Sequence, residues 1–264
     1  MSFAQASAVS GGPGRWSAEL PVGWDIFGVT NGGFLMAIAT RAMEQETDGR
    51  ELISATGSFM NPAGPGPVEI GVETLKQGRS LSTLRATITA EGRDLVLVTG
   101  VYGDPDRPRH DTDLVLGEPP KLPPPEQCVL AVPSEVAPLP PPFTGKVEVR
   151  GHPDDSKAIL GDKTGTPLMR GWFRLLDDEL LDAHGVVLAS DALPPAIFNA
   201  DLAVGWTPTI DLVVQVRNPR PRGWIACRFA TRFVTDGMLE EDGELWDQAG
   251  NLVALSRQLA LVPR

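Results

Sequence analysis

The clearest structural signal in the sequence is the segment from Asn31 to Gln45, NGGFLMAIATRAMEQ. Its apolar side chains would cover most of the circumference of a helix, so we predict a buried helix over residues 32–45. Asn31 is a favourable N-cap residue, and Gly49 follows shortly after the predicted end. A buried helix needs a surface around it, and a curved sheet can provide one.

The residues after this helix show the patterns of strands joined by tight turns. Residues 68–73 alternate between apolar and polar side chains, which predicts a strand with one buried face. Further strands are predicted over residues 81–89 and 95–102, with a hairpin turn at residues 91–94 between them. The first part of the chain is therefore a helix followed by antiparallel strands.

The second part repeats this order. A helical pattern within residues 178–191 stops before Pro194 and Pro195, because proline cannot continue a helix. The strands predicted after it cover residues 210–216, 224–234, 238–246 and 252–262. A helix followed by antiparallel strands, found twice, predicts the α+β fold class.

A proline-rich segment separates the two parts. Twelve of the 25 prolines lie between Asp104 and Pro142, and such a segment forms neither a helix nor a central strand. We therefore expect an N-terminal domain over residues 1–103, an extended connector over 104–142 and a C-terminal domain over 143–264.

The two parts are weakly similar to each other. Phe59-Met60-Asn61-Pro62 matches Val216-Arg217-Asn218-Pro219, and residues 90–98 match residues 247–255. Both matches have the same spacing, 157 positions, which indicates an internal duplication, although short Asn-Pro and Gly-turn pairs also recur by chance.

Composition narrows the class of protein. The chain has 264 residues, 42% of them apolar, and a net charge of −11, which disfavours a nucleic-acid binder because phosphate contacts need a basic surface. Cys128 and Cys227 form no CxxC pair, so no zinc or redox motif is present; two thiols fit a reducing compartment, and a single disulfide is also compatible.

The N-terminal residues lack a basic segment followed by an apolar one, and the longest apolar run is too short to cross a bilayer. We therefore expect a soluble, cytoplasmic protein without a membrane span.

Several runs resemble the acyl-CoA thioesterase II family, whose members are double hotdogs. These runs are Phe27–Gly33, Ser58–Gly64, Val72–Ser82, Ala189–Asp191, Thr209–Asp211 and Ser256–Gln258. The resemblance implies two curved antiparallel sheets, each wrapped around a central helix. It also implies an enzyme that hydrolyses acyl-CoA, with an active site in the second half built from Asp191, Thr209 and Gln258. Pro194-Pro195 departs from the family pattern, as does Asn61, where relatives often carry a basic residue.

Thioester hydrolysis needs an activated water and a stabilised oxyanion. The resemblance assigns the water to Asp191, Thr209 and Gln258: a carboxylate accepts its proton, and a hydroxyl and an amide fix its position. Burial near apolar side chains is expected to raise the pKa of Asp191. The chain lacks a Gly-x-Ser-x-Gly elbow, which disfavours an acyl-enzyme hydrolase, and no cofactor is required.

Backbone N–H groups at Asn31, Gly32 and Gly33 offer a place for the oxyanion at the start of the first helix, although they are equally compatible with capping alone.

The duplication supports function at these positions. At the 157-residue spacing, the counterparts in the first half are all apolar, namely Phe34, Leu52 and Val101. Gln258 shares a strand face with small residues, which leaves room beside its amide. Each residue also has a structural interpretation: Asp191 as a helix-end or turn carboxylate, and Thr209 as a turn hydroxyl. The parity of Thr209 groups it with Asp211 rather than Leu212, which leaves its face undecided.

Two arginines, Arg217 and Arg220, are candidates for binding the phosphates of CoA, although with Arg222 they also fit a solvated turn. The histidines His110, His152 and His184 are scattered, so no metal site is predicted.

The alternative function is a hotdog module that binds acyl-CoA or a fatty acid without turnover; a hotdog hydratase is disfavoured because no Asp and His lie at short spacing on one helix start. Exposed sheet edges favour a homo-oligomer, a dimer of double hotdogs.

Overall fold

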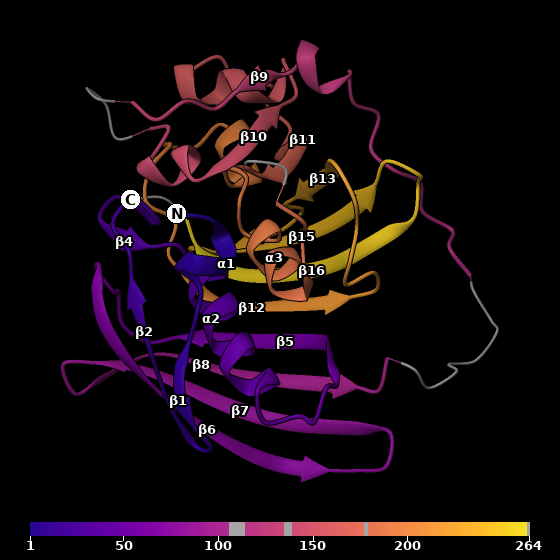
Figure 1. Ribbon diagram of the computed structural model, residues 1–264. Coiled ribbons are helices and arrows are strands. Elements are labelled where there is room, and N and C mark those ends of the chain that lie inside the picture. Colours follow the sequence, from indigo (N-terminus) through magenta and orange to yellow (C-terminus); the bar gives the residue numbers. More distant parts are fainter. Residues whose placement is uncertain (106–113, 135–138, 177–178, 263–264) are drawn as a thin grey trace.

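The computed structural model describes residues 1–105, 114–134, 139–176 and 179–262 (Figure 1). Within these residues, one antiparallel sheet contains 14 strands, and the short strands β3 (Asp25–Ile26) and β4 (Val29–Thr30) pair separately. No described helix is long and apolar enough to cross a membrane.

The first half of the chain forms one side of the large sheet. In order across the sheet, its strands are β1 (Ser10–Gly12), β2 (Arg15–Leu20), β6 (Gly66–Gln77), β7 (Leu81–Ala90), β8 (Arg93–Gly103) and β5 (Glu51–Phe59). The predicted strands at 68–73, 81–89 and 95–102 correspond to β6, β7 and β8. The predicted hairpin turn is present, with Glu91 and Gly92 both at positive φ.

The second half continues the same sheet. In order, its strands are β12 (Thr209–Val216), β16 (Leu252–Leu261), β15 (Met238–Asp247), β13 (Ile225–Ala230), β11 (Leu168–Leu175), β10 (Val147–Gly151) and β9 (Val129–Leu130), and β14 (Val234–Thr235) pairs with β15. The sequence predicted β12, β13, β15 and β16, but not β10 or β11.

Strands β5 and β12 join the two halves, so the two expected sheets are one continuous sheet. The central pair of this junction is Thr56 with Val213, two residues that lie 157 positions apart. The flanking pairs are Ser58 with Asp211 and Ser54 with Gln215. If 157 is added to the residue number on β5 and subtracted from the residue number on β12, the pair Ser58–Asp211 becomes the pair Gln215–Ser54, and the reverse also holds. The junction therefore has the local twofold symmetry that an internal duplication predicts.

The two Asn-Pro motifs also occupy equivalent places. The backbone N–H of Asn61 donates to the carbonyl of Leu95, and that of Asn218 donates to the carbonyl of Val253. Each motif thus ends its strand, β5 or β12, with the same contact to the neighbouring strand.

Two helices lie on the inner side of the curved sheet (Figure 1). Helix α2 (Gly32–Glu44) packs against β5, β6, β7 and β8, and α3 (Ala183–Ala189) packs against α2, β5, β11 and β12. The predicted first helix is confirmed: Asn31 caps it by accepting a hydrogen bond from the N–H of Phe34, and its side chains are almost all buried. The second predicted helix is also present: α3 lies within residues 178–191, and Asp182 caps its start.

Buried polar and aromatic contacts fix α2 in place. His184 of α3 bonds through Nδ1 to Thr40 Oγ1 at 2.9 Å and through Nε2 to Glu44 Oε2 at 3.0 Å. The ring of Trp24 stacks on Phe34, with centroids 4.3 Å apart. The His184 bonds hold the C-terminal end of α2 against α3, and the Trp24 ring packs on its first turn, so α2 is fixed at both ends.

The remaining elements are short. They are α1 (Phe3–Ala6) and the 3₁₀ turns η1 (Pro125–Gln127), η2 (Pro142–Gly145), η3 (Asp155–Leu160) and η5 (Ala196–Asn199). The predicted connector contains one short strand, β9, which lies at the edge of the sheet. Proline-rich segments are expected to contribute edge strands rather than central ones. Its residues 106–113 and 135–138 lie outside the described part of the chain, and so does His110.

Candidate active site

A cavity of about 340 Å³ lies between the two halves of the chain. Its walls are largely apolar and include Leu35, Phe59, Phe143, Leu193 and Phe198. Asp191, Thr209 and Gln258 all line it. The structure therefore brings the three predicted catalytic residues to one cavity, although they are distant in sequence.

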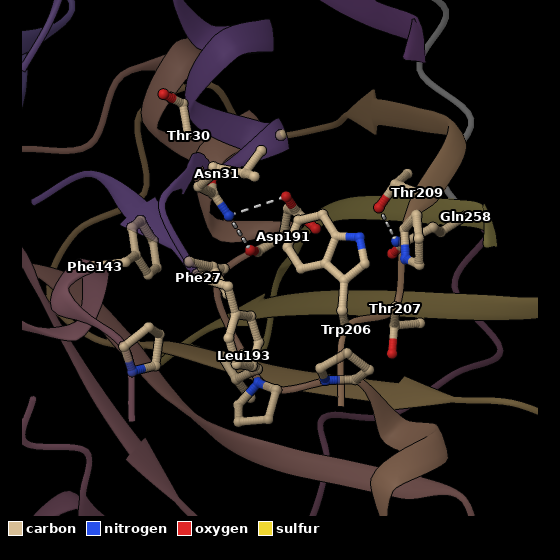
Figure 2. A pocket seen from close by; sticks show the side chains of 18 of the residues that line it. Phe27, Thr30, Asn31, Phe143, Asp191, Leu193, Trp206, Thr207, Thr209 and Gln258 are labelled. Atoms are coloured by element: carbon tan, nitrogen blue, oxygen red, sulfur yellow. Dashed lines mark hydrogen bonds between the residues drawn. The ribbon is translucent and has the colours of Figure 1, made fainter. Parts of the chain in front are cut away.

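Asp191 lies just after α3 and faces the first turn of α2. Its Oδ2 atom accepts hydrogen bonds from the backbone N–H of Gly33 at 2.8 Å and from the side-chain amide of Asn31 at 3.0 Å. The same Asn31 amide also donates to the Asp191 carbonyl at 2.9 Å. Since a helix N-terminus favours negative charge, α2 holds this carboxyl and orients it (Figure 2).

Only glycine allows this approach at position 33. A Cβ atom built on Gly33 would lie 2.8 Å from the Cβ of Asp191 and 3.2 Å from the carbonyl oxygen of Leu188. Neither atom can move aside by a change of rotamer, because Asp191 Cβ is fixed to its backbone and the Leu188 oxygen is part of the backbone. Gly33 is therefore required for the contact between the two halves at this point.

The environment of Asp191 tunes its acidity. Burial raises its pKa from 3.8 to about 6, and the hydrogen bonds from Gly33, Asn31 and Gly32 oppose this rise. A carboxylate with a pKa of about 6 is ionised at neutral pH and accepts a proton more readily than an exposed one.

Thr209 and Gln258 form a hydrogen-bonded pair on neighbouring strands. The Gln258 amide donates to the Thr209 hydroxyl. Gln258 lies opposite Leu212 on β12, so it occupies the inner face of the sheet. A register shift between Thr209 and Asp211 inserts an extra residue and places Thr209 opposite Ala260, on the same face as Gln258. This bulge places the Thr209 side chain on the inner face of the sheet, which the alternation in the sequence left undecided.

The Asp191 carboxyl and the Thr209–Gln258 pair face the same space (Figure 2). Asp191 is close enough to Glu241 for its charge to raise the pKa of Glu241, and Glu241 lies directly opposite Gln258 in the ladder between β15 and β16. A fourth polar side chain, Glu241, thus lines the same cavity as the three predicted residues.

An aromatic pair lies at the rim of the cavity. The rings of Phe27 and Trp206 meet edge to face, with centroids 5.9 Å apart, and both side chains are partly exposed. Phe27 comes from the first half and has a φ of 53°, a strained value for a bulky residue. The two halves therefore contribute jointly to the entrance as well as to the interior.

Comparison with known families decides the class of protein. The family model for the acyl-CoA thioesterase N-terminal domain matches residues 20–103, and the model for the C-terminal domain matches residues 125–262. The chain belongs to the acyl-CoA thioesterase family.

Two solved structures share the whole fold of this acyl-CoA thioesterase family member. A protein from Thermobifida fusca YX that carries the name thioesterase II is 33% identical, with a TM-score of 0.84, over 100% of this chain and 98% of that one. A hotdog-fold protein of unknown function from Alicyclobacillus acidocaldarius is 20% identical, with a TM-score of 0.83, over 98% of this chain and 97% of that one. The likeness identifies a hotdog fold with a large antiparallel sheet.

A similar sequence is also known from Mycobacterium tuberculosis. That protein, which is uncharacterized, is 26% identical over 267 residues, covering 94% of this chain and 91% of its own. The similarity extends over both halves of this chain.

The predicted oxyanion donors of this family member are occupied in a different way. Asn31 caps α2 and also donates to Asp191, while the N–H of Gly33 donates to Asp191 Oδ2. Gly32 lines the cavity, and a Cβ atom on it would meet Phe59 at 3.0 Å. These residues therefore position the carboxyl, and the Gly33 N–H has no free place for a substrate oxygen while that bond is made.

The structure does not bring Arg217 and Arg220 to the cavity. They follow the C-terminal end of β12, whereas Thr209 begins this strand about 24 Å away at ~3.4 Å per residue. Arg217 donates to Gln215, and Arg220 pairs with Glu51. Their predicted contact with CoA phosphates is not supported by this placement.

The local twofold symmetry of the β5–β12 junction relates the cavity to a place in the first half, at the end of the junction beside these arginines. Side chains fill that place. In the first half, Leu84 corresponds to Glu241 and pairs with Gly100, as Glu241 pairs with Gln258. A Cβ on Gly100 would lie 2.7 Å from the ring of Tyr102. The sheet register thus makes Gly100, rather than Val101, the counterpart of Gln258.

The helices do not keep the 157-residue spacing, because their N-caps, Asn31 and Asp182, are only 151 residues apart. Phe34 is therefore not the counterpart of Asp191.

The histidines and cysteines of the described segments have structural places. His184 joins the two helices, and His152 lies next to Asp155 on η3. Cys128 and Cys227 are both free thiols. Among the residues that the structure covers, no group of three or more His, Cys, Asp or Glu side chains is placed to hold a metal ion.

Proposed function

We propose that the protein hydrolyses an acyl-CoA thioester to the free acid and CoA, with the attacking water bound by Asp191, Thr209 and Gln258. The observation that carries this proposal is the cavity itself. In a chain of the acyl-CoA thioesterase family, it combines a carboxyl held at a helix N-terminus with a Thr–Gln pair on a largely apolar wall.

The chemistry requires no covalent intermediate with the protein. Asp191 takes a proton from the water as the water oxygen attacks the thioester carbon, and Thr209 and Gln258 orient the water by hydrogen bonds. The tetrahedral intermediate then collapses with cleavage of the C–S bond. The proton held by Asp191 passes to the departing sulfur, which leaves as the thiol of CoA, and the carboxylate is regenerated.

The remaining walls suit the acyl group. Their side chains are mainly aliphatic and aromatic, and the volume lies at the lower end of the range for small-molecule sites. We also propose that residues 1–103 and 143–264 are two hotdog units, each wrapped around its own helix, and that 104–142 connects them.

The homo-oligomer expected from the sequence stays a prediction that light scattering of the purified chain can test.

The direct test is the release of free thiol from butanoyl-, octanoyl- and hexadecanoyl-CoA. We expect turnover of at least one of these, and a loss of roughly 10²–10⁴-fold in kcat for Asp191→Asn, as is typical when a general base is removed. Asp211→Asn is the matched control, because Asp211 lies on the outer face of β12 and bonds to Ser58 at 2.6 Å.

Two outcomes would contradict the proposal. Equal loss of activity in both variants would show a general effect on the fold. Tight binding of an acyl-CoA without thiol release, at any of the three chain lengths, would favour the binding-module alternative.

A further inference from the structure

Glu241 is a buried acid that the proposed water-activating set does not use. It lies on the inner face of β15, is 8% exposed and lines the cavity. A carboxyl in an apolar interior is costly unless it is bonded or has a task. The neighbouring acids on the same strand, Glu240 and Asp242, lie on the outer face and pair with arginines.

One oxygen of Glu241 is bound by the protein. Oε2 accepts a hydrogen bond from the backbone N–H of Ala196, at the start of η5, at 2.5 Å. Within the described residues, Oε1 has no hydrogen-bond partner. The side chain is therefore held at one end, with its second oxygen available to a molecule in the cavity.

The position next to Gln258 places this oxygen near the proposed reaction centre. Glu241 and Gln258 are direct partners in the ladder between β15 and β16. Phe229 of β13 also lines the cavity and carries no charge. Asp191 lines the same cavity and interacts with Glu241 electrostatically.

The fold itself does not require an acid here. Leu84, the counterpart in the first half, is fully buried in the core. A leucine therefore satisfies the same position of the sheet when no cavity is present, and Glu241 differs from it by a group that can bond to a ligand.

We propose that Glu241 in its protonated form donates a hydrogen bond from its carboxyl to the thioester carbonyl oxygen, and thereby stabilises the oxyanion beside Gln258. This inference rests on the proposed function. It fills a gap, because the N–H of Gly33, one of the donors expected from the sequence, is bonded to Asp191. The proton stays on Glu241 throughout, so the balance of the reaction is unchanged.

The acidity of the two carboxyls fits this division of tasks. Burial raises the pKa of Glu241 to about 8; the Ala196 N–H opposes the rise, and the charges of Asp191 and Glu240 add to it. Asp191 has a pKa of about 6. Between these values Asp191 is ionised and can accept a proton, while Glu241 is protonated and can donate a hydrogen bond. Such a separation of two acids in one site is a common basis for distinct roles.

The test is the pH profile of kcat/KM for thiol release from octanoyl-CoA or, if it is not turned over, the panel member that is. In the unaltered protein we expect activity to rise through about pH 6 and to fall through about pH 8. Glu241→Gln keeps an oxygen for the Ala196 N–H and an N–H₂ donor that does not ionise. We expect it to retain activity within about tenfold and to lose the alkaline fall.

Glu241→Leu removes the donor while copying the residue of the first half. We expect a loss of about 10²–10³-fold in kcat, as for the removal of one oxyanion donor, with an unchanged circular dichroism spectrum. The matched control is Glu244→Gln, on the outer face of the same strand, where Glu244 pairs with Arg228 at 3.2 Å. It should leave the profile unaltered.

The inference is overturned if Glu241→Gln keeps the alkaline fall, or if Glu241→Leu is as active as the unaltered protein. It is also overturned if Glu241→Gln loses as much activity as Glu241→Leu, which would assign the role to an ionised carboxylate. Failure of the proposed function would look different, because the unaltered protein would then release no thiol from any member of the panel.

Discussion

Replacing Asp191 with asparagine should make the protein more stable at neutral pH while lowering kcat. In the unfolded chain this carboxyl ionises near pH 3.8, but in the folded protein its pKa is about 6 because it is buried. Between these values the unfolded state releases the proton first, so ionisation favours unfolding. The free energy of unfolding therefore falls as the pH rises through this window and is constant above it.

The size of the effect follows from the shift. A difference of about two pKa units, at ~1.4 kcal/mol per unit, amounts to about 3 kcal/mol lost above pH 6. Asparagine has the same shape, and its oxygen can accept the bonds from Gly33 and Asn31 that Asp191 Oδ2 accepts now. The variant should therefore keep the hydrogen bonds from Gly33 and Asn31 and avoid the loss of unfolding free energy above pH 6.

The assay is urea unfolding of both proteins at several values between about pH 4 and pH 7. The stability of Asp191→Asn minus that of the unaltered protein should grow by about 3 kcal/mol across this range. Asp242→Asn is a control of opposite sign, because its hydrogen bonds and ion pairs with Arg257 and Arg232 lower the pKa of Asp242. That variant should be less stable than the unaltered protein at neutral pH and approach it in acid. A difference for Asp191→Asn that is independent of pH, or a variant less stable at pH 7, would refute the reasoning.

Three further changes test the site. Gly33→Ala should lower kcat by roughly 10²-fold, because the added Cβ displaces Asp191, and a normal kcat would contradict the close contact. Thr209→Val should lower kcat/KM about tenfold through the loss of one hydrogen bond to the Gln258 amide, and a change below twofold would remove Thr209 from the water site. Arg220→Ala should leave the KM for acyl-CoA within about twofold, because Arg220 pairs with Glu51 away from the cavity; a tenfold rise would instead support a contact with CoA phosphates.

Local patterns were enough to predict part of the fold. The apolar circumference of α2 and the Asn31 cap are both read from consecutive residues, as is the alternation along β6. Strand β5 was not predicted, because a register shift between Leu52 and Ser54 disrupts its alternation. Strand β11 alternates strictly between half-buried and buried residues, so its signal was present in the sequence and was overlooked.

The site was harder to predict because its contacts join distant parts of the chain. The bond between Gly33 and Asp191 spans 158 residues and has no local signal. The face of Thr209 depends on a bulge that only the pairing with β16 reveals. Glu241 lies between two other acids, which suggests a solvated run, yet Leu239 and Leu245 share its parity and are buried. That parity was the signal that could have found it.

The junction of β5 with β12 has a consequence for how such a chain can change. Two identical subunits related by a twofold axis would present every substitution at both ends of their shared ladder. Here the two halves belong to one polypeptide, and each position of the ladder has its own codon. A substitution therefore alters only one end of the β5–β12 ladder. One end is packed solid with Leu84 and Tyr102, and the other is hollow around Glu241. A packed core and a cavity thus occupy opposite ends of the same ladder, and either can be redesigned without altering the residues of the other.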